Sequence, residues 1–204
     1  MLELFPEEYN NSKNYLPYDG CAHYYGRILT QEEADFYFQT LLNTLKFQPD
    51  EVVIFGKKII TKREVAWYGY DELEYTYSHT TKKSHRWTRE LLELKQKVEA
   101  VTQHQFNACL VNLYHDGSEG MSWHSDNEKD LENNSAIASL SLGAERRFMF
   151  KHKTTKEKVE LRLQHGSLLI MKNETQHFWL HQVPISKKIT TPRINLTFRS
   201  IKVI

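Results

Sequence analysis

The chain has 204 residues, enough for one domain that buries a core without disulfide staples. Its 40% hydrophobic residues exclude a largely disordered chain, and 27 Lys and Arg against 26 Asp and Glu mean that any contact with a polyanion must come from local basic clusters. The sequence has no apolar run near the ~18 residues of a membrane-spanning helix, no secretory signal pattern and too few cysteines for a disulfide scaffold, which predicts an intracellular protein with no membrane partner.

The N-terminal part predicts an irregular extension followed by a helix. Residues 1–20 are polar and lack a hydrophobic period, so we place a single domain at residues 21–204. Thr30 and Glu33 form a capping box, in which a threonine and a glutamate three residues later start a helix. Apolar residues then recur at helical spacing and predict a face packed in the core: Ala34, Phe38, Leu41, Leu42 and Leu45.

The next stretch predicts a hairpin, a short strand and a second helix. Residues 51–55 and 58–61 are apolar segments that flank Gly56 and Lys57, a pattern typical of a β-hairpin. Tyr75 and Tyr77 share one face of a strand. A second helix opens at Ser84 or Thr88, and its core face comprises Trp87, Leu91, Leu94, Val98 and Val101.

From Phe106 onward the pattern changes to short strands separated by turn residues. The predicted strands are 106–115, 136–142, 147–152, 158–163, 167–171, 177–183 and 193–201. Many short strands at this spacing favour a sandwich or barrel. The predicted fold class is therefore α+β, mainly β, with two or more helices packed outside one sheet.

A candidate metal site comes from a short histidine–aspartate motif. His124 and Asp126 lie two residues apart, so on an extended segment both side chains point to one side. His177 and His181 on a later predicted strand each offer a third ligand. Two histidines and one carboxylate form the facial triad of non-haem Fe(II) oxygenases, which leaves open positions for a co-substrate and O2, whereas zinc favours a tetrahedral site. A solvated loop around Asp126 is the alternative.

The last predicted strand carries a fully polar face, which comprises Arg193, Asn195, Thr197 and Arg199. Such a face is typical either of an edge strand in water or of a pocket that binds an anion. Asn112 and Tyr114 share a face of an earlier strand and can donate hydrogen bonds to a bound carboxylate. The pattern thus suits a doubly anionic small molecule that also chelates iron.

The motifs together resemble the AlkB family of Fe(II)/2-oxoglutarate-dependent dioxygenases, closest to its DNA-repair branch. The resemblance runs from about residue 50 to the C-terminus, and its most specific motif is the segment 193–199 in register with His124, Asp126 and a distal histidine. It also rests on residues 112–114, 123–126, 139–143, 147–152, 165–169 and 179–181. It implies a double-stranded β-helix (jelly-roll) core at about 106–204 and a nucleotide-recognition part at about 50–85.

The same resemblance implies the ligands and the reaction. Its metal ligands are His124, Asp126 and His181, and His177 does not match the family position. Its 2-oxoglutarate residues are Asn112, Tyr114, Arg193, Asn195, Thr197 and Arg199. The expected cofactors are Fe(2+), 2-oxoglutarate and O2. The expected reaction is oxidative demethylation of bases such as 1-methyladenine and 3-methylcytosine in single- and double-stranded DNA, with release of formaldehyde, and RNA is a further candidate substrate.

Reading a methylated base in a duplex requires flipping it out of the stack. By the resemblance Tyr75 and Tyr77 stack on the target base, His124 lies on its other side, and Asn127 and Glu128 contact its edge. Phe55 with Gly56 at the hairpin tip is the candidate wedge that fills the gap. The basic residues around the tip are candidates for phosphate contacts: Lys57, Lys58, Lys62 and Arg63. The alternatives are ordinary strand packing for the aromatics and a solvated loop for residues 127 and 128.

Two other classes of function remain open from the sequence. A dioxygenase of the same fold that acts on RNA, protein or a small molecule keeps the metal ligands and arginines but does not need Phe55, Tyr75 or Tyr77. In the second alternative, the chain is a non-catalytic β-sandwich binding module, and its histidine–aspartate motif arises by chance. For the favoured reading we expect a monomer that works in the cytoplasm of a bacterium or in the nucleus of a eukaryote.

Overall fold

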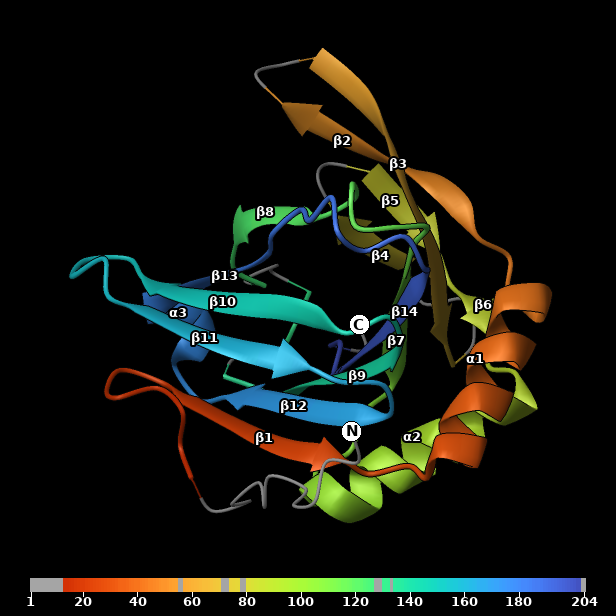
Figure 1. Ribbon diagram of the computed structural model, residues 1–204, viewed down its shortest axis with the longest axis horizontal. Helices are drawn as coiled ribbons and strands as arrows, with labels where there is room; N and C mark the ends of the chain where they lie inside the picture. Colours follow the sequence, from red (N-terminus) through yellow and green to blue (C-terminus); the bar gives the residue numbers. More distant parts are fainter. Residues whose placement is uncertain are drawn as a thin grey trace.

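Two antiparallel sheets stacked face to face form the centre of this computed structural model (Figure 1). The structure describes residues 13–54, 57–70, 74–77, 80–126, 130–132 and 134–202, with the backbone alone for 52–54, 57–59, 74–77 and 80–83. The larger sheet follows the order β1 (Cys21–Arg27), β12 (Ser167–Lys172), β9 (Ile137–Gly143), β14 (Arg193–Arg199), β7 (Ala108–Tyr114), β3 (Lys57–Gly69) and β2 (Gln48–Ile54), and β6 (His85–Arg86) pairs with β3.

The smaller sheet lies across one face of the larger one. Its order is β11 (Lys158–Leu163), β10 (Arg146–His152), β13 (Trp179–Val183) and β8 (Met121–His124). A separate pair consists of β4 (Glu74–Tyr77) and β5 (Thr80–Lys83). Two stacked antiparallel sheets with helices outside them are the predicted mainly-β fold with a jelly-roll core, which is confirmed.

Alternation along the central strands divides the core into two layers. Ile194, Leu196 and Phe198 of β14 pack toward the helices, in one buried hydrophobic cluster. The intervening residues of β14, from Arg193 to Arg199, therefore point toward the smaller sheet, as does Ala108 of β7 in the second cluster. The polar face of β14 is consequently buried between two sheets, and the alternative of a solvated edge strand is wrong.

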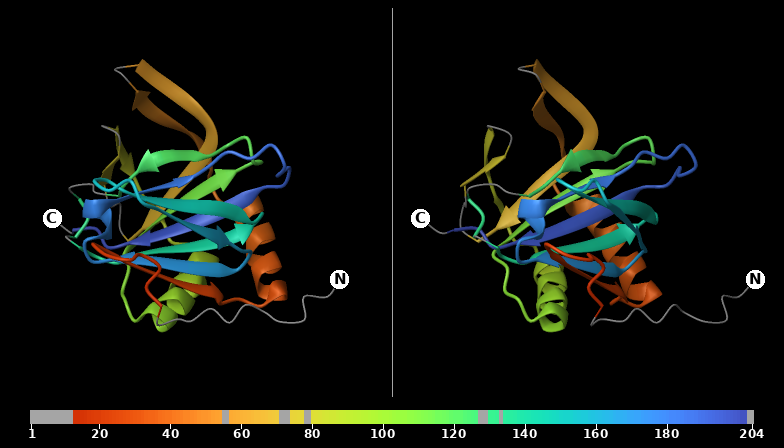
Figure 2. Two further views of the ribbon diagram at one scale, coloured as in Figure 1. Left: turned by 60° about the vertical axis from the view of Figure 1, so that its left-hand side comes forward. Right: turned by 90° about the vertical axis from the view of Figure 1, so that its left-hand side faces the viewer.

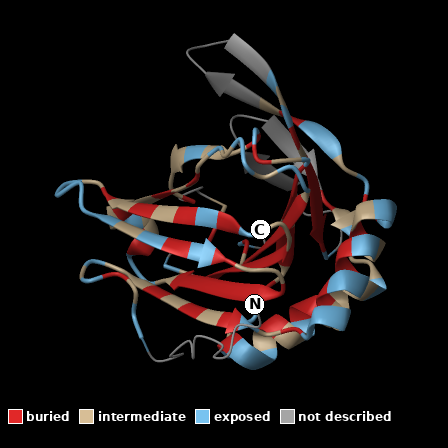
Figure 3. Ribbon diagram, viewed as in Figure 1, coloured by how far each residue is buried: buried red, intermediate tan, exposed pale blue. Residues whose placement is uncertain are grey.

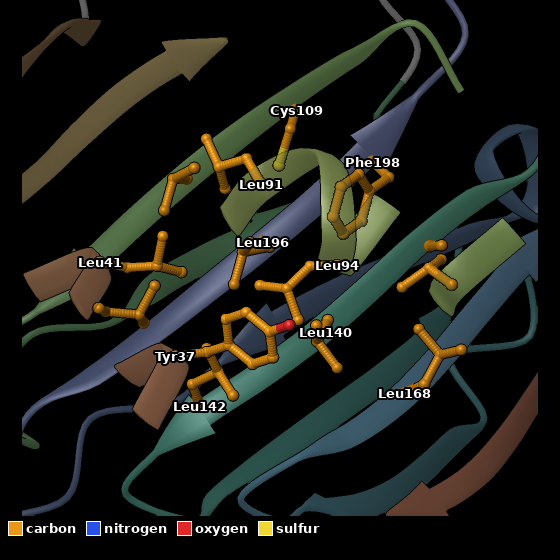
Figure 4. Packing of buried hydrophobic residues seen from close by; sticks show 14 of the residues in the cluster. Tyr37, Leu41, Leu91, Leu94, Cys109, Leu140, Leu142, Leu168, Leu196 and Phe198 are labelled. Carbon is orange, nitrogen blue, oxygen red and sulfur yellow. The ribbon is translucent and has the colours of Figure 1, made fainter. Parts of the chain in front are cut away.

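The two long helices cover the outer face of the larger sheet. α1 (Gln31–Thr44) starts with the predicted capping box, since Thr30 Oγ1 accepts from the Glu33 amide and the Glu33 carboxylate accepts from the Thr30 amide. α2 (Arg89–Thr102) is capped by Thr88. Leu41 of α1 and Leu91 of α2 meet the sheet residues Leu140 and Leu196 in the same cluster (Figure 4). Buried positions follow the sheet-facing side of each helix, whereas the other side is exposed (Figure 3).

Several element boundaries differ from those predicted. Trp87 precedes α2 instead of lying within it, although it still packs against the core and stacks on Phe198. Val101 is exposed, so its place on the core face is wrong. The strand predicted from residue 177 begins at Trp179, because α3 (Thr175–Phe178) forms one helical turn before it.

The hairpin of β2 and β3 projects beyond the sandwich (Figure 2). Its far part is the predicted hairpin, but β3 continues to Gly69 and joins the larger sheet by pairing with β7. The pairing of β2 with β3 shifts register between Pro49 and Glu51, at the base of the projecting part. A β-bulge or similar irregularity there bends the ribbon away from the sheet.

Residues 13–20 are irregular, as expected for the extension, but they are anchored to the sandwich. Leu16 is buried, and the Trp179 indole donates to the Tyr18 carbonyl at 3.0 Å. Across the described part of the chain, no helix has both the length and the apolar character to span a membrane.

Candidate functional site

His124, Asp126 and His181 converge between the sheets. The antiparallel pairing of β8 and β13 places His124 and His181 directly opposite each other, and Asp126 follows the end of β8. The His124 Nε2 and His181 Nε2 atoms lie 3.6 Å and 3.9 Å from Asp126 Oδ1. Within the described part of the chain, this is the one group of three His, Cys, Asp or Glu side chains whose ligand atoms all lie within 4.8 Å of one another.

Hydrogen bonding orients the ring of His124, and burial keeps His181 neutral. His124 Nδ1 lies 2.7 Å from the Ser122 carbonyl oxygen, which can only accept, so Nδ1 donates this hydrogen bond and Nε2 is the nitrogen that faces Asp126. His181 is buried against the ring of Phe148, and burial lowers its pKa to about 3. Neutral imidazole is the form that binds a metal.

Arg199 keeps the third ligand anionic. Its Nη2 atom donates to Asp126 Oδ2 at 2.8 Å, and both side chains are buried. Burial alone would raise the pKa of the Asp126 carboxyl, but the Arg199 guanidinium and the two neighbouring histidines together hold that pKa below its usual range. Oδ1 faces the two histidines, so one carboxylate serves the arginine and the metal position together.

The donor set fits a first-row divalent metal. Two imidazole nitrogens and one carboxylate oxygen lie within 4.8 Å of one another, and this donor set is typical of non-haem Fe(II) sites. Asp126 is 5% exposed and His181 5%, so the position is shielded from bulk water while His124 is half-buried. His181 belongs to the group, whereas His177 lies in α3, is exposed and is not a member of it, so the metal-ligand prediction of His181 stays the favoured one.

Arg193 lies at the opposite end of β14 from Arg199 and is 1% exposed. Its Nη2 donates to Ser141 Oγ at 2.9 Å, whereas Nε and Nη1 have no hydrogen-bond partner among the described residues. Burial lowers the pKa of Arg193 to about 10, so it stays protonated at neutral pH. A buried guanidinium with donors to spare is what an anionic co-substrate would satisfy.

Asn195 and Thr197, the polar-face residues of β14 between these arginines, form hydrogen bonds mainly within the sheet. The Asn195 amide donates to Ser139 Oγ at 2.7 Å and to the Leu140 carbonyl at 3.2 Å. Thr197 Oγ1 donates to Asn195 Oδ1 at 3.1 Å. Asn195 is therefore held against β9, and its predicted contact with 2-oxoglutarate stays a prediction.

A cavity joins the metal position to the polar strands. It is lined by His124, Asp126 and His181 together with residues of β7, β9 and β14: Leu110, Asn112, Tyr114, Ser139, Asn195, Thr197 and Arg199. Arg193 does not line the cavity, but Tyr114 does. The guanidinium carbon of Arg193 lies 5.4 Å from the centre of the Tyr114 ring. Five of the six predicted co-substrate residues thus surround one cavity beside the metal position.

The residues predicted to read the base lie largely beyond what the structure describes. Phe55, Gly56, Asn127 and Glu128 fall outside the described residues. The backbones of Lys57, Tyr75 and Tyr77 are described: Lys57 pairs with Ile54, and the two tyrosines occupy β4. The structure does not describe the side chains of these three residues.

Arg63 corrects one sequence-based assignment. It was expected to face phosphates beside the hairpin tip, but it is buried, contacts the Asp50 carboxylate at 2.5 Å and donates to Asn112 Oδ1. Arg146 was also missed; it donates to the Glu119 carbonyl at 2.7 Å and lies 5.6 Å from the Tyr114 ring centre. Residue type gives no signal for either, because exposed and buried arginines look alike in sequence.

Comparison with known proteins shows the family of the chain. A family model for the 2OG-Fe(II) oxygenase superfamily matches residues 21–199. The human protein named DNA oxidative demethylase ALKBH2 is 38% identical over 188 residues, or 87% of this chain and 72% of that protein. The Bos taurus alpha-ketoglutarate-dependent dioxygenase alkB homolog 3 is 39% identical over 180 residues, or 83% of this chain and 62% of that protein.

A solved structure supports the fold. The protein reported as "The structure of OsALKBH1" superposes with a TM-score of 0.64 over 92% of this chain and 99% of that chain. At 16% sequence identity, this likeness concerns the fold alone.

Proposed function

The chain belongs to the 2OG-Fe(II) oxygenase superfamily, and we propose that it repairs DNA by oxidative demethylation of N-alkylated bases such as 1-methyladenine and 3-methylcytosine. The observation that carries the proposal is the triad of His124, Asp126 and His181 beside the buried polar face of β14. Support for the substrate comes from the 38% identity to the human protein named DNA oxidative demethylase ALKBH2.

The triad residues would hold Fe(II), through Nε2 of each histidine and Oδ1 of Asp126. When bound with 2-oxoglutarate and O2, the iron supplies oxidation of an N-alkyl carbon, after which formaldehyde leaves and the base is restored. The protein orients the reactants and excludes water. Ser122 fixes the tautomer of His124, and Arg199 keeps Asp126 ionised.

The co-substrate would bind among Asn112, Tyr114, Arg193, Thr197 and Arg199. Its distal carboxylate would accept a hydrogen bond from a spare donor of Arg193, Nε or Nη1, neither of which has a partner among the described residues. The carboxylate–keto end would bind near the metal, beside Arg199. Asn195 lies in the same cavity and would act through Thr197, which donates to it.

The substrate would be a flipped base in single- or double-stranded DNA. Tyr75 and Tyr77 would stack on it, Asn127 and Glu128 would contact its edge, and the hairpin tip with Phe55, Gly56 and Lys57 would occupy the gap in the duplex. We infer a monomer without a membrane partner, active where the genome is: the cytoplasm of a bacterium or the nucleus of a eukaryote.

The decisive experiment is a panel of oligonucleotides that carry one methylated base. DNA and RNA, each single- and double-stranded, are incubated with the Fe(II)-loaded protein, 2-oxoglutarate and O2, and the restored base and formaldehyde are measured. The proposal expects restoration in DNA with one formaldehyde per lesion, and none with Asp126→Ala. Restoration in RNA alone, or 2-oxoglutarate turnover without restoration of any oligonucleotide, would contradict the DNA assignment and favour a same-fold oxygenase with another substrate.

A further inference from the structure

Three buried polar side chains connect the base of the β2–β3 hairpin to the co-substrate cavity. Asp50 in β2 is 1% exposed, Arg63 in β3 is 4% exposed and Asn112 in β7 is 6% exposed. Arg63 Nη2 contacts Asp50 Oδ2 at 2.5 Å, and Arg63 Nη1 donates to Asn112 Oδ1. Asn112 in turn lines the cavity beside the metal position.

A break in strand register turns Arg63 inward. Pro49 pairs with Glu64 and Glu51 pairs with Ile60, so Asp50 alone faces residues 61–63. Within this irregular segment of β3, Thr61 Oγ1 donates a hydrogen bond to the Arg63 carbonyl at 2.7 Å. Irregularities of this kind occur next to active sites, where they re-aim a side chain.

The chemistry of the three groups fixes the orientation of the Asn112 amide. A guanidinium donates hydrogen bonds and cannot accept, so the Asn112 atom that faces Arg63 must be the carbonyl oxygen. The NH2 group of Asn112 is then left to face the cavity as a donor. Asp50 neutralises Arg63, so the arginine supplies this orientation without adding a positive charge to the cavity.

We infer that Arg63 is a positioning residue for the co-substrate: it holds Asn112 with its NH2 group toward an incoming carboxylate. The inference rests on the proposed function, since it takes 2-oxoglutarate as the molecule that Asn112 receives. Without Arg63 the amide can turn, and its oxygen then faces the anion and repels it. Asp50 holds Arg63 in place from the hairpin side.

The test measures binding and does not depend on turnover. Calorimetry under anaerobic conditions gives the Kd of 2-oxoglutarate for the Fe(II)-loaded protein, and the Tm without 2-oxoglutarate reports folding. Arg63→Lys keeps a cation beside Asp50 but lacks the planar fork. The double variant Asp50→Asn with Arg63→Gln removes both charges, so that no buried charge is left alone, and a Gln side chain can present either donor or acceptor to Asn112. Arg162→Lys is the matched control, since Arg162 forms an exposed ion pair with Glu145.

We expect Arg63→Lys and the double variant each to raise the Kd by about tenfold, the size of one charged hydrogen bond, while Arg162→Lys leaves it unchanged. In an Asn112→Ala background the same changes should alter the Kd by less than about twofold, because the amide that Arg63 orients is gone. Equal losses in both backgrounds would overturn the inference and make Arg63 a structural tie. Failure of the unmodified protein to bind 2-oxoglutarate would instead overturn the proposed function, and the inference with it.

Discussion

His124 and His181 are direct partners across two antiparallel strands, and their ring centres lie 4.2 Å apart. They are far apart in the chain and meet because β8 pairs with β13 at that residue. Asp126, just after β8, completes the triad. The two histidines are thus brought together by backbone hydrogen bonds that do not require the metal.

Replacing His124, Asp126 or His181 by Ala should abolish metal binding and turnover while the protein still folds. Loss of a residue that only supports a metal ligand lowers activity by roughly 10- to 100-fold, and we expect loss of a ligand itself to lower it further. Metal content, demethylation rate and far-UV circular dichroism check this. In a metal-loaded crystal structure each ligand atom should lie about 2.0–2.2 Å from the ion. His177→Ala is the control, and a loss of metal in that variant would contradict the triad.

Arg193→Lys should weaken 2-oxoglutarate binding by about tenfold or more, on the order of 1.4 kcal/mol. A lysine retains the charge but has no planar guanidinium with further donors such as Nε and Nη1, which have no partner among the described residues. The Kd for 2-oxoglutarate provides the measurement, with the exposed Arg147→Lys as the matched control. An unchanged Kd in Arg193→Lys would assign the distal carboxylate to another residue.

Phe55→Ala should lower the rate of 1-methyladenine repair in duplex DNA by at least about tenfold. The rate in single-stranded DNA should stay within about threefold of that of the parent protein. A single strand leaves no gap to fill, whereas opening a duplex costs a few kcal/mol, roughly. The prediction comes from the sequence, since Phe55 is outside the described residues. Rates on both substrates are compared at one salt concentration, because phosphate contacts depend on salt.

The control for this comparison is Phe36→Ala, which removes an exposed phenylalanine of α1 on the far side of the larger sheet. It should leave both rates near those of the parent protein. Equal losses on duplex and single strands in Phe55→Ala would make Phe55 a packing residue and remove the wedge from the proposal.

The two cysteines should differ in reactivity. Cys109 is fully buried, and burial raises the pKa of its thiol strongly, so very little reactive thiolate forms at neutral pH. Cys21 is half-buried and burial also raises its pKa, so its alkylation should be slow but measurable and should speed up as pH rises. Mass spectrometry after iodoacetamide treatment should find Cys21 modified in the native protein and Cys109 only after unfolding. Early modification of Cys109 would show that the α2-covered core opens.

Local patterns were sufficient where neighbours in the chain decide the structure. The capping box at Thr30 and Glu33 depends on hydrogen bonds within one turn, and it is present. The alternation of Arg193 to Arg199 follows from strand geometry alone, and the two faces separate as predicted. The motif of His124 and Asp126 likewise placed two of the three converging ligands.

Tertiary contacts decided the rest. Residues 175–178 form a helical turn because Thr175 is anchored to the Lys172 and Cys21 carbonyls, which moves His177 off the strand and leaves His181 in the site. Strand β1 was missed since its partner β12 is far along the chain. Arg63 carries the same charge whether it faces solvent or the core, and only the register break opposite Asp50 turns it toward Asn112. The sequence by itself determined which residues can bind a metal and an anion, while the pairing of distant strands determined which of them meet, because register is set by hydrogen bonds between segments that the local pattern does not connect.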